Sequence, residues 1–340
     1  MKVCLVTGGM GFIGSNFIRF VLESNIDLKI INVDKLTYAG NPENLKNIEE
    51  KYPNQYKFYR NDIRDFDAID NIIQKDDIDY IINFAAESHV DRSIYNPSLF
   101  CDTNISGTIS LLNSAKKNNI KKYLQISTDE VYGSLSLNDA PFDENHQLSP
   151  NSPYAASKAS ADLLVRAYYK SFNLPINITR CSNNYGPYQF PEKLIPLLIN
   201  NALSNKELPI YGKGINVRDW IYVIDHCKAI VKVLLEGSIG EIYNIGGDSE
   251  ISNVDLAEIL LELMNKQKSL ITFVKDRPGH DLRYAMNHNK ITKELNWKPE
   301  VDFEKGLKLT VDWYVSNKKW LENVINQDYL KFYEKQYTCR

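Results

Sequence analysis

A glycine-rich turn between a strand-like run and a helix-like run constrains the fold of this chain more than any other segment. The sequence TGGMGFIGS, residues 7–15, places Gly8, Gly11 and Gly14 at three-residue steps. Glycine permits a tight turn, lets a pyrophosphate approach the backbone, and allows the helix to pack closely on the strand. Free N–H groups at the helix N-terminus attract phosphate. Taken alone the motif is weak, because such turns also occur for packing reasons.

Strand and helix signals alternate through the first half of the chain. Strand-like runs appear at VCLVTG, KIINVD, YKFYRND, YIINFAA, KYLQIST and INITRC, with helical spacing at Ile13–Glu23, Ser98–Lys117 and Tyr154–Phe172 between them. Such alternation predicts an α/β fold with a doubly wound parallel sheet covered by helices on both faces.

The character of the sequence changes from Asn183 onward. Turn-rich pieces are mixed there with helical spacing at 193–203 and 253–263, while EIYNIGG reads as one more buried strand. We therefore predict a second, smaller lobe that interleaves with the first. The predicted division is residues 1–182 plus about 218–248 for the first domain, and about 183–217 plus 249–340 for the second lobe.

Composition excludes several classes of protein. A net charge of −3 over 340 residues gives no electrostatic footprint for nucleic acid or an anionic membrane. The apolar part of KVCLVTGG is too short for a signal peptide, and no apolar run approaches the ~20 residues of a membrane-spanning helix. The five cysteines form no CxxC pair or Cys/His cluster, so neither a metal site nor a disulfide framework is expected. A reducing cytoplasm fits these features.

Asp34 strengthens the nucleotide interpretation of the glycine turn. It lies twenty residues after Gly14 and ends the apolar run KIINV. An acidic side chain there suits hydrogen bonds to the adenosine ribose, and it would repel the additional phosphate of NADP. The alternative is a helix or turn cap. We expect NAD as the cofactor, with Asp62 at the end of the next strand within reach of the adenine.

Two further patterns suggest chemistry. In YAASK, Tyr154 and Lys158 share one helix face, where the ammonium and a nearby NAD⁺ would lower the phenol pKa from about 10 toward that of a working base. This spacing also arises by chance, but Thr128 ends an earlier strand and completes a set suited to oxidising a secondary alcohol. Asp129 and Glu130 follow Thr128 directly, either as solvated loop charges or as an acid and a base.

TGGMGFIGS together with YAASK resembles the extended short-chain dehydrogenase/reductase superfamily. More narrowly, the chain is similar to nucleotide-sugar 4,6-dehydratases, and most of all to the branch that acts on dTDP-glucose. The resemblance runs through most of the chain and rests on FAAESHVDRS, ISTDEVYG, SPYAASKAS, TRCSNNYGPYQFPEKLIP, LPIYGKG, RDWIYV and DRPGHD. It implies an extended Rossmann fold, bound NAD, a nucleotide-diphosphohexose substrate and a homodimer.

The resemblance also implies a role for each catalytic residue. C4 of the hexose is oxidised, which makes C5 acidic; water then leaves across C5 and C6, and hydride returns to C6. Tyr154 would be the base for the C4 hydroxyl, Lys158 would tune it, and Thr128 would hold the same hydroxyl. Glu130 would remove the C5 proton, and Asp129 would protonate the departing C6 hydroxyl.

Binding residues follow from the same resemblance. The implied cofactor residues are Gly8, Gly11, Phe12, Ile13, Gly14, Asp34, Lys35, Leu36, Thr37, Asp62, Ile63, Ala85, Ala86, Ser88, Thr103, Tyr154, Lys158 and Asn184. The implied substrate residues are His89, Thr128, Asn183, Lys193, Leu194, Pro209, Ile210, Tyr211, Arg218, Asn253, Asp276, Arg277 and His280. Three alternatives stay open: Tyr211 as a core residue, Arg218 in an internal salt bridge, and His89 as a structural histidine.

The sequence also allows rival functions to be weighed and a dimer interface to be predicted. A C4 epimerase or decarboxylase would not need Asp129 and Glu130, and a non-catalytic NAD-binding module would not need Thr128, Tyr154 and Lys158. UDP-glucose and UDP-N-acetylglucosamine remain alternative substrates, and rhamnose or another deoxysugar is the expected pathway product. For the dimer we expect helices 98–117 and 154–172 to pair through their surplus apolar positions, which include Leu111, Leu112, Leu163 and Leu164.

Overall fold

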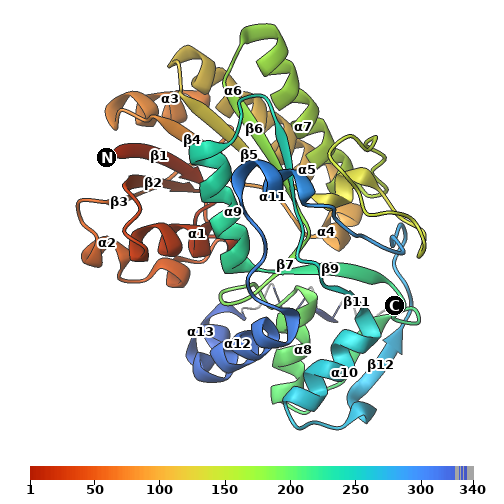
Figure 1. The fold of residues 1–340 in the computed structure, drawn as a ribbon. Coiled ribbons are helices and arrows are strands. Elements are labelled where there is room, and N and C mark those ends of the chain that lie inside the picture. The colour runs from red at the N-terminus through yellow and green to blue at the C-terminus, as the bar shows by residue number, and fades with distance from the viewer. Residues whose placement is uncertain (326–328, 330, 332, 335–340) are drawn as a thin grey trace.

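The large lobe is built on one parallel sheet (Figure 1). The structure is a computed structural model that describes residues 1–325, 329, 331, 333 and 334, so Cys339 lies outside the described residues. The sheet has the strand order β10-β6-β5-β4-β1-β2-β3, and every neighbouring pair is parallel. Its strands are β1 (Lys2–Thr7), β2 (Leu28–Asp34), β3 (Tyr56–Arg60), β4 (Tyr80–Asn83), β5 (Lys122–Thr128), β6 (Ile176–Cys181) and β10 (Ile242–Ile245). The predicted doubly wound parallel sheet is confirmed.

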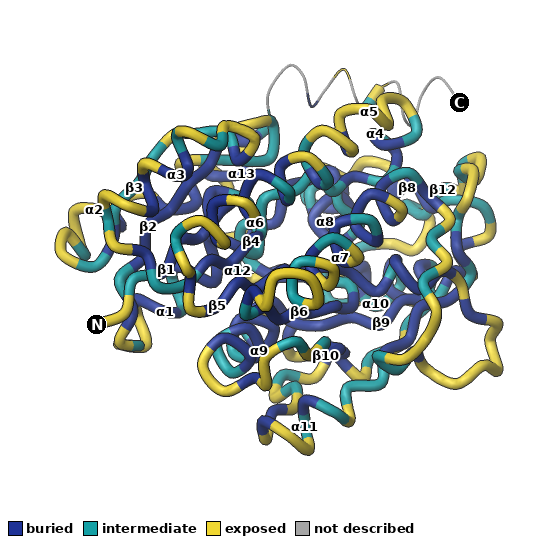
Figure 2. The backbone as a smooth tube through the Cα atoms, turned by 90° about the horizontal axis from the view of Figure 1, so that it is seen from above, coloured by how far each residue is buried: buried dark blue, intermediate teal, exposed yellow. Residues whose placement is uncertain are grey.

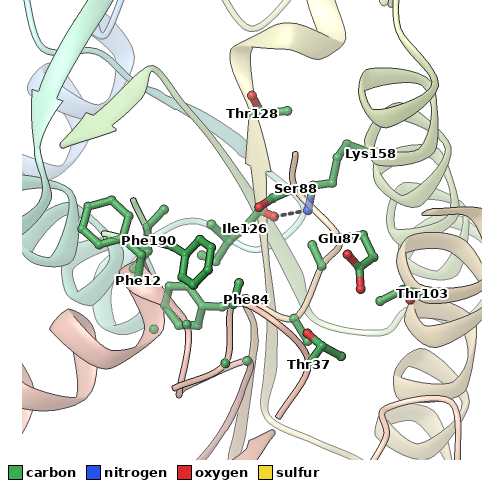
Figure 3. A pocket seen from close by; sticks show the side chains of 18 of the residues that line it. Phe12, Thr37, Phe84, Glu87, Ser88, Thr103, Ile126, Thr128, Lys158 and Phe190 are labelled. Atoms are coloured by element: carbon green, nitrogen blue, oxygen red, sulfur yellow. Dashed lines mark hydrogen bonds between the residues drawn. The ribbon is translucent and has the colours of Figure 1, made fainter. Parts of the chain in front are cut away.

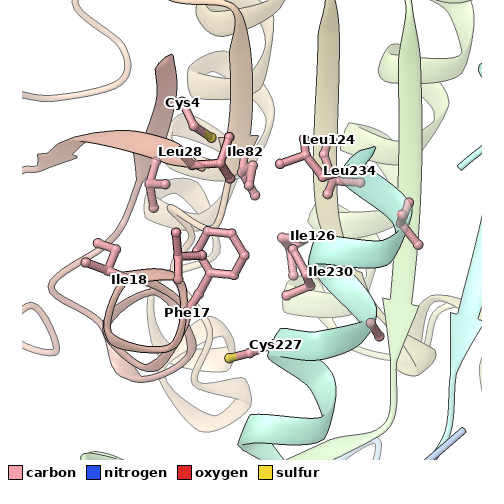
Figure 4. Packing of buried hydrophobic residues seen from close by; sticks show 14 of the residues in the cluster. Cys4, Phe17, Ile18, Leu28, Ile82, Leu124, Ile126, Cys227, Ile230 and Leu234 are labelled. Carbon is pink, nitrogen blue, oxygen red and sulfur yellow. The ribbon is translucent and has the colours of Figure 1, made fainter. Parts of the chain in front are cut away.

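Helices cover both faces of this sheet with separate cores. One face packs against α1 (Phe12–Glu23), α9 (Val223–Glu236) and α11 (Asn289–Leu295). Figure 4 shows Phe17 of α1 and Ile230 of α9 lying close to Ile82 and Ile126 of the sheet. The opposite face packs against α3 (Phe66–Lys75), α6 (Gly107–Lys117) and α7 (Pro153–Phe172). Each fully buried Ile or Phe side chain stabilises the fold by roughly 1.5–3 kcal/mol.

The helix predicted at Ser98–Lys117 is interrupted. It consists of α5 (Pro97–Phe100), a π-helical segment at Cys101–Ser106, and α6. At Gly107 a Cβ atom would lie 2.5 Å from the side chain of Ile63, so α6 approaches the segment after β3 too closely for a larger residue.

The expected apolar surplus of these helices is partly wrong. Leu111 and Leu112 are fully buried in the chain's own core, because α6 is enclosed by the sheet, α3 and α7. Leu164 packs against the same core, and only Leu163 of the four projects outward, with 55% of its surface exposed.

The smaller lobe has two small sheets and its own core. β7 (Asn183–Tyr185), β9 (Val217–Tyr222) and β11 (Glu250–Ser252) form one sheet, and β8 (Leu208–Tyr211) pairs with β12 (Ile271–Val274) in the other. Its helices are α8 (Leu194–Leu203), α10 (Asn253–Leu263), α12 (Phe303–Ser316) and α13 (Lys318–Val324). Figure 2 shows buried backbone running through α8, α10 and β9, with exposed segments at the periphery.

The chain passes between the lobes more than once. It leaves the large sheet after β6, forms β7, α8, β8 and β9, and returns through α9 and β10 before entering the smaller lobe again. The boundary predicted near residue 218 falls inside β9, which pairs with β7 and β11. The exact domain division stays a prediction. Short helical segments occupy the connections: α2 (Ile48–Lys51), α4 (Val90–Tyr95) and the 3₁₀ turns Pro42–Leu45, Asp129–Tyr132 and Lys268–Leu270.

Candidate active site

A cavity of about 320 Å³ lies where the strands of the large sheet end, between the two lobes (Figure 3). Ligands of doubly wound sheets bind at this edge. Of the residues predicted to bind the cofactor, Leu36 alone does not line the cavity, because its side chain packs into the core beside α1. The cavity is lined by Gly8, Gly11, Phe12, Ile13, Gly14, Asp34, Lys35, Thr37, Asp62, Ile63, Ala85, Ala86, Ser88, Thr103, Tyr154, Lys158 and Asn184, among others.

The glycine turn has the close approaches that its spacing suggests. Gly8 has a φ of +72°, and a Cβ atom there would lie 2.6 Å from the backbone nitrogen of Ala85. A Cβ atom at Gly14 would lie 2.5 Å from the carbonyl oxygen of Gly8. No side chain caps the N-terminus of α1 at Gly11, and no acidic residue lies in its first turn. The free N–H groups of this turn therefore fit a pyrophosphate.

Asp34 both closes a turn and faces the cavity. Its carboxylate accepts hydrogen bonds from the backbone N–H of Met10 at 2.9 Å and of Leu36 at 2.7 Å. Burial raises the pKa of Asp34, and these two hydrogen bonds oppose that rise. A carboxylate has acceptor capacity beyond two bonds, so Asp34 fits a ribose hydroxyl as well as capping its turn. Asp62, by contrast, pairs with Lys35 and Arg64, each at 2.7 Å.

The residues predicted to be catalytic meet in one buried space. Thr128 ends β5, and its hydroxyl donates to Asp129 Oδ1 at 3.1 Å and lies beside the phenol of Tyr154. Tyr154 and Lys158 lie in the first two turns of α7, whose start is fixed by Ser152 accepting the N–H of Ala155. The ammonium of Lys158 donates to the carbonyl of Ile126 at 2.7 Å (Figure 3).

The lowering of the Tyr154 pKa by Lys158 together with NAD⁺ stays a prediction. Burial raises the pKa of Tyr154 well above its usual value, and the negative charge of Glu130 raises it further. Burial also lowers the pKa of Lys158, whose ammonium is bound to a carbonyl. Desolvation therefore outweighs the attraction between the two groups.

Asp129 and Glu130 are neighbours in sequence with different surroundings. Burial raises the pKa of Asp129 well above its usual value, and the charges of Glu130 and Asp219 add to that rise. Burial raises the pKa of Glu130 too, but the cationic groups of Arg277, Lys193 and Arg218 oppose the rise. The alternative of solvated loop charges fails for Asp129, which is only 2% exposed. Both pKa values are therefore raised, and only at Glu130 do several cationic groups oppose the effect of burial.

The predicted substrate residues divide into two groups. Thr128, Asn183 and Lys193 line the cavity, and the buried Oδ1 of Asn183 has no hydrogen-bond partner within the protein. Lys193 sits at the N-cap of α8, directly before Leu194, and donates to the carbonyl of Ser88 at 2.7 Å. The remaining residues lie next to this wall or in the smaller lobe.

In the smaller lobe, Arg218 does not form the internal salt bridge that was left open as its alternative role. Arg218 donates to the carbonyls of Val217 at 2.7 Å and Asp281 at 2.9 Å, whereas Asp219 accepts the N–H groups of Gly247 and Ser249. An internal Arg218–Asp219 salt bridge is therefore not formed.

Tyr211 is not a plain core residue either. Its hydroxyl donates to Asp91 at 3.1 Å, and its ring meets the edge of His280. Pro209 and Ile210 of the same strand are buried, with Ile210 inside the core of the lobe.

The other predicted substrate residues differ in how far their polar groups are satisfied within the protein. The Oδ1 atom of Asn253 and the Nε atom of Arg277 are buried without hydrogen-bond partners in the protein, and His280 pairs with Asp276 at 2.6 Å. Burial, followed by the charge of Lys193, lowers the pKa of His89 to about 3. His89 is therefore neutral near pH 7 and can act only as a neutral hydrogen-bonding group.

Sequence reasoning missed several residues of the cavity wall. Glu87, Phe190 and Glu192 line it, and Glu192 directly precedes Lys193 in a motif that had already been singled out. Cys181 also lines the cavity beside Asn184, whose amide donates to its sulfur at 3.3 Å. Burial raises the pKa of the Cys181 thiol to about 12. For Glu192 the available signal was its position directly before Lys193, a predicted binding residue.

Comparison with known proteins identifies the family. The family model described as GDP-mannose 4,6 dehydratase matches residues 5–310. A dTDP-glucose 4,6-dehydratase from Shigella flexneri is 48% identical, with both chains covered completely. The chain belongs to the nucleotide-sugar 4,6-dehydratase family.

Solved structures of this dehydratase family have the same fold. The dTDP-glucose 4,6-dehydratase from Bacillus anthracis, solved with NAD, has a TM-score of 0.89 and 48% identity over 96% of this chain and 100% of that one. The Streptomyces venezuelae enzyme, solved with NAD and TYD bound, has a TM-score of 0.92 and 46% identity over 95% and 100%. A Thermotoga maritima UDP-glucose 4-epimerase has a TM-score of 0.86 and 29% identity over 93% and 100%. Both of these solved dehydratases contain NAD.

The structure also bears on whether the dehydratase could bind a metal ion or span a membrane. Among the residues that the structure describes, no group of three or more His, Cys, Asp and Glu side chains could hold a metal ion. None of the described helices is long and apolar enough to cross a membrane.

Proposed function

We propose that this chain is an NAD-dependent dTDP-glucose 4,6-dehydratase that forms the 4-keto-6-deoxy sugar nucleotide. The observation that carries the proposal is that Asp129 and Glu130 lie in the cavity wall beside Thr128 and Tyr154 in different surroundings. Burial raises the pKa of both carboxyl groups, and the cationic groups around Glu130 oppose that rise, so the two groups are suited to act as an acid and a base. Water elimination across C5 and C6 needs this combination.

Each catalytic side chain has a defined task in this reaction. Thr128 and Tyr154 hold the C4 hydroxyl, and Tyr154 takes its proton as C4 becomes a ketone. Glu130 then removes the C5 proton, which the C4 ketone has made acidic. Asp129 gives its proton to the C6 hydroxyl, which leaves as water, and C5 regains a proton as C6 is reduced.

Bound NAD supplies the two-electron acceptor for C4 and the donor for C6, so the overall reaction is redox-neutral. The turn at Gly8–Gly14 and the carboxylate of Asp34 would hold its pyrophosphate and ribose. Lys158 would place its ammonium near the same ribose and beside Tyr154. The remaining wall of the cavity, with Asn183 and Lys193, faces the sugar nucleotide.

The nearest rival is a C4 epimerase, because an epimerase with 29% identity shares the fold. Epimerisation requires oxidation and reduction at C4 only, so neither Asp129 nor Glu130 would have a task there. A non-catalytic NAD-binding module would leave the whole buried set without a role. A dehydratase acting on UDP-glucose or UDP-N-acetylglucosamine differs only in substrate, and the 48% identity to a dTDP-glucose enzyme favours dTDP-glucose.

A substrate panel tests the function. The protein is incubated separately with dTDP-glucose, UDP-glucose and UDP-N-acetylglucosamine, and the 4-keto product is followed by its absorbance in alkali and by mass. We expect a mass loss of one water from dTDP-glucose with the highest kcat/KM and without net NADH. A C4-epimerised product of unchanged mass, or release of one NADH per turnover, would contradict the proposal.

We also make proposals for the assembly, the cellular location and the pathway of the enzyme. We infer a homodimer whose interface includes the outer face of α7, where Leu163 is exposed. Light scattering at micromolar concentration should give twice the mass of the chain, and a monomer would contradict it. We also place the enzyme in the cytoplasm, where its free cysteines stay reduced, and in the synthesis of rhamnose or another deoxysugar.

A further inference from the structure

Tyr38 joins two walls of the cavity that belong to different lobes. It lies in the loop after β2, and its ring meets the ring of Phe190 edge-on at 5.6 Å between centroids. The guanidinium of Arg92 lies 3.9 Å above the same ring. The Tyr38 hydroxyl is directed at the carboxyl of Glu192, which accepts a hydrogen bond from Arg92 at 3.0 Å. All parts of this side chain are therefore held by residues distant in sequence.

The loop that carries Tyr38 is the one that faces the ribose end of the cofactor site. Thr37, Ala39 and Gly40 line the cavity on either side of Tyr38, and Asp34 precedes them. Phe190 and Glu192 line the opposite wall, next to Lys193. Tyr38 thus connects the wall that fits the adenosine ribose with the wall that fits the sugar nucleotide.

Each of the two walls contains a residue in an unusual backbone conformation. Leu36 has a φ of +59° and Tyr188 a φ of +67°, which are left-handed conformations that bulky residues rarely adopt. Such conformations persist only where the surroundings enforce them. The N–H of Leu36 is held by Asp34, and the Tyr188 ring lies under the guanidinium of Arg19 and against Trp313. The segments that carry Tyr38 and Phe190 thus each contain a residue in a left-handed conformation two positions earlier.

We propose that Tyr38 is a latch that fastens the ribose-binding loop to the smaller lobe and thereby slows the release of NAD. Because Glu192 and Phe190 belong to the wall next to Lys193, a ligand on that wall fixes the partners of Tyr38. The latch therefore couples the two sites: a bound nucleotide diphosphate slows NAD release further. Reciprocity requires that NAD also tightens nucleotide binding by the same factor.

Three variants distinguish a role of Tyr38 in retaining NAD from a general effect on the stability of the fold. Tyr38→Ala removes the ring contacts with Phe190 and Arg92, and Tyr38→Phe removes only the hydroxyl group next to Glu192. Tyr59→Phe is the matched control, because the Tyr59 hydroxyl donates to a carboxylate, Asp76, at 2.7 Å, but within the large lobe. All three are compared with the wild type by thermal unfolding, so that a loss of fold is recognised.

The experiment measures the rate at which the purified holoenzyme releases NAD. Excess alcohol dehydrogenase with ethanol reduces each released NAD⁺, and the absorbance of NADH reports the rate, with and without saturating dTDP. Tyr38→Ala should release NAD about tenfold faster than the wild type. Tyr38→Phe should release it about threefold faster. Tyr59→Phe should match the wild type.

The effect of dTDP is the measurement that a purely structural role would not change. In the wild type and in Tyr59→Phe, dTDP should slow NAD release several-fold, and in Tyr38→Ala it should change the rate less than twofold. Equal release rates in Tyr38→Ala and the wild type, or an undiminished dTDP effect in Tyr38→Ala, would overturn the latch. The dTDP arm rests on the proposed substrate. If dTDP fails to affect even the wild type, the coupling is refuted, while the rates without dTDP still decide whether Tyr38 retains NAD.

Discussion

Two proton-handling regions share the buried space of the active site, and the protein prepares them differently. Burial pushes Tyr154, Lys158, Asp129 and Glu130 alike toward their neutral forms. Around Glu130 three cationic side chains oppose burial, whereas the charges of both carboxylates add to its effect on Tyr154. For Glu130, groups of the chain itself therefore oppose the rise in pKa. For Tyr154, we expect the positive nicotinamide ring of bound NAD⁺ to lower the pKa of the phenol.

The largest expected effect comes from removing the phenol. Tyr154→Phe leaves the apolar contacts of α7 unchanged but deletes the base for C4, and such losses typically lower kcat by ~10²–10⁴-fold. Steady-state turnover of dTDP-glucose measures the effect, with NAD content and thermal unfolding as controls. Turnover near that of the wild type would show that another group deprotonates the C4 hydroxyl.

Replacing the two carboxylates one at a time should divide the reaction. Glu130→Gln should reduce turnover by on the order of 10²–10³-fold and abolish exchange of the C5 hydrogen with solvent, because the base is lost. Asp129→Asn should retain C4 oxidation and some C5 exchange while loss of the C6 hydroxyl becomes slow, so bound NADH accumulates. Thr128, Tyr154 and Lys158 are unchanged in both variants.

Mass spectrometry after reaction in deuterated water, together with the absorbance of reduced nicotinamide, distinguishes the two variants. Identical behaviour of Glu130→Gln and Asp129→Asn would mean that the difference in their surroundings has no catalytic meaning. Normal deuterium incorporation and turnover in both would remove the main support for dehydration.

A smaller effect should appear in the pH profile. Glu130 must be ionised to act as a base, so activity falls as pH decreases through its raised pKa. The charge of Arg277 opposes that rise. In Arg277→Gln the pKa of Glu130 therefore rises further, and the acid limb of kcat moves to higher pH. An unmoved limb in kcat, with a change in KM alone, would restrict Arg277 to substrate binding.

The smallest effect is expected on the alkaline limb of the pH profile of kcat. Asp129 must be protonated to act as an acid, so activity falls as pH increases through its raised pKa. Asp219 contributes to that rise, so Asp219→Asn should lower the pKa of Asp129 and move the alkaline limb to lower pH. The change in kcat at neutral pH should be about two- to threefold. A shift toward higher pH would contradict this reading of the electrostatics.

The sequence predicts local features of the molecule well. The spacing of Gly8, Gly11 and Gly14 and the position of Asp34 depend on neighbouring residues only, and they locate the turn and the acidic end of β2. Likewise the order of strand-like and helix-like runs is enough to predict the parallel sheet.

Features that depend on distant contacts were missed or misjudged. The burial of both Leu111 and Leu112 depends on α3 and α7, and helical spacing alone does not reveal that a helix is enclosed. The carbonyl partners of Arg218 lie partly at Asp281, 63 residues away. The pKa of Tyr154 depends on how completely the site is desolvated, which a motif cannot convey.

The buried thiol of Cys181 gives the dehydratase a chemical tolerance. With a pKa of about 12, only about one thiol in 10⁵ is ionised at pH 7, and the thiolate is the form that peroxides and alkylating reagents attack. The sulfur that borders the reaction space should therefore survive oxidative stress and treatment with iodoacetamide. Of the cysteines that the structure describes, Cys101 is the exposed one and offers the handle for a fluorescent label.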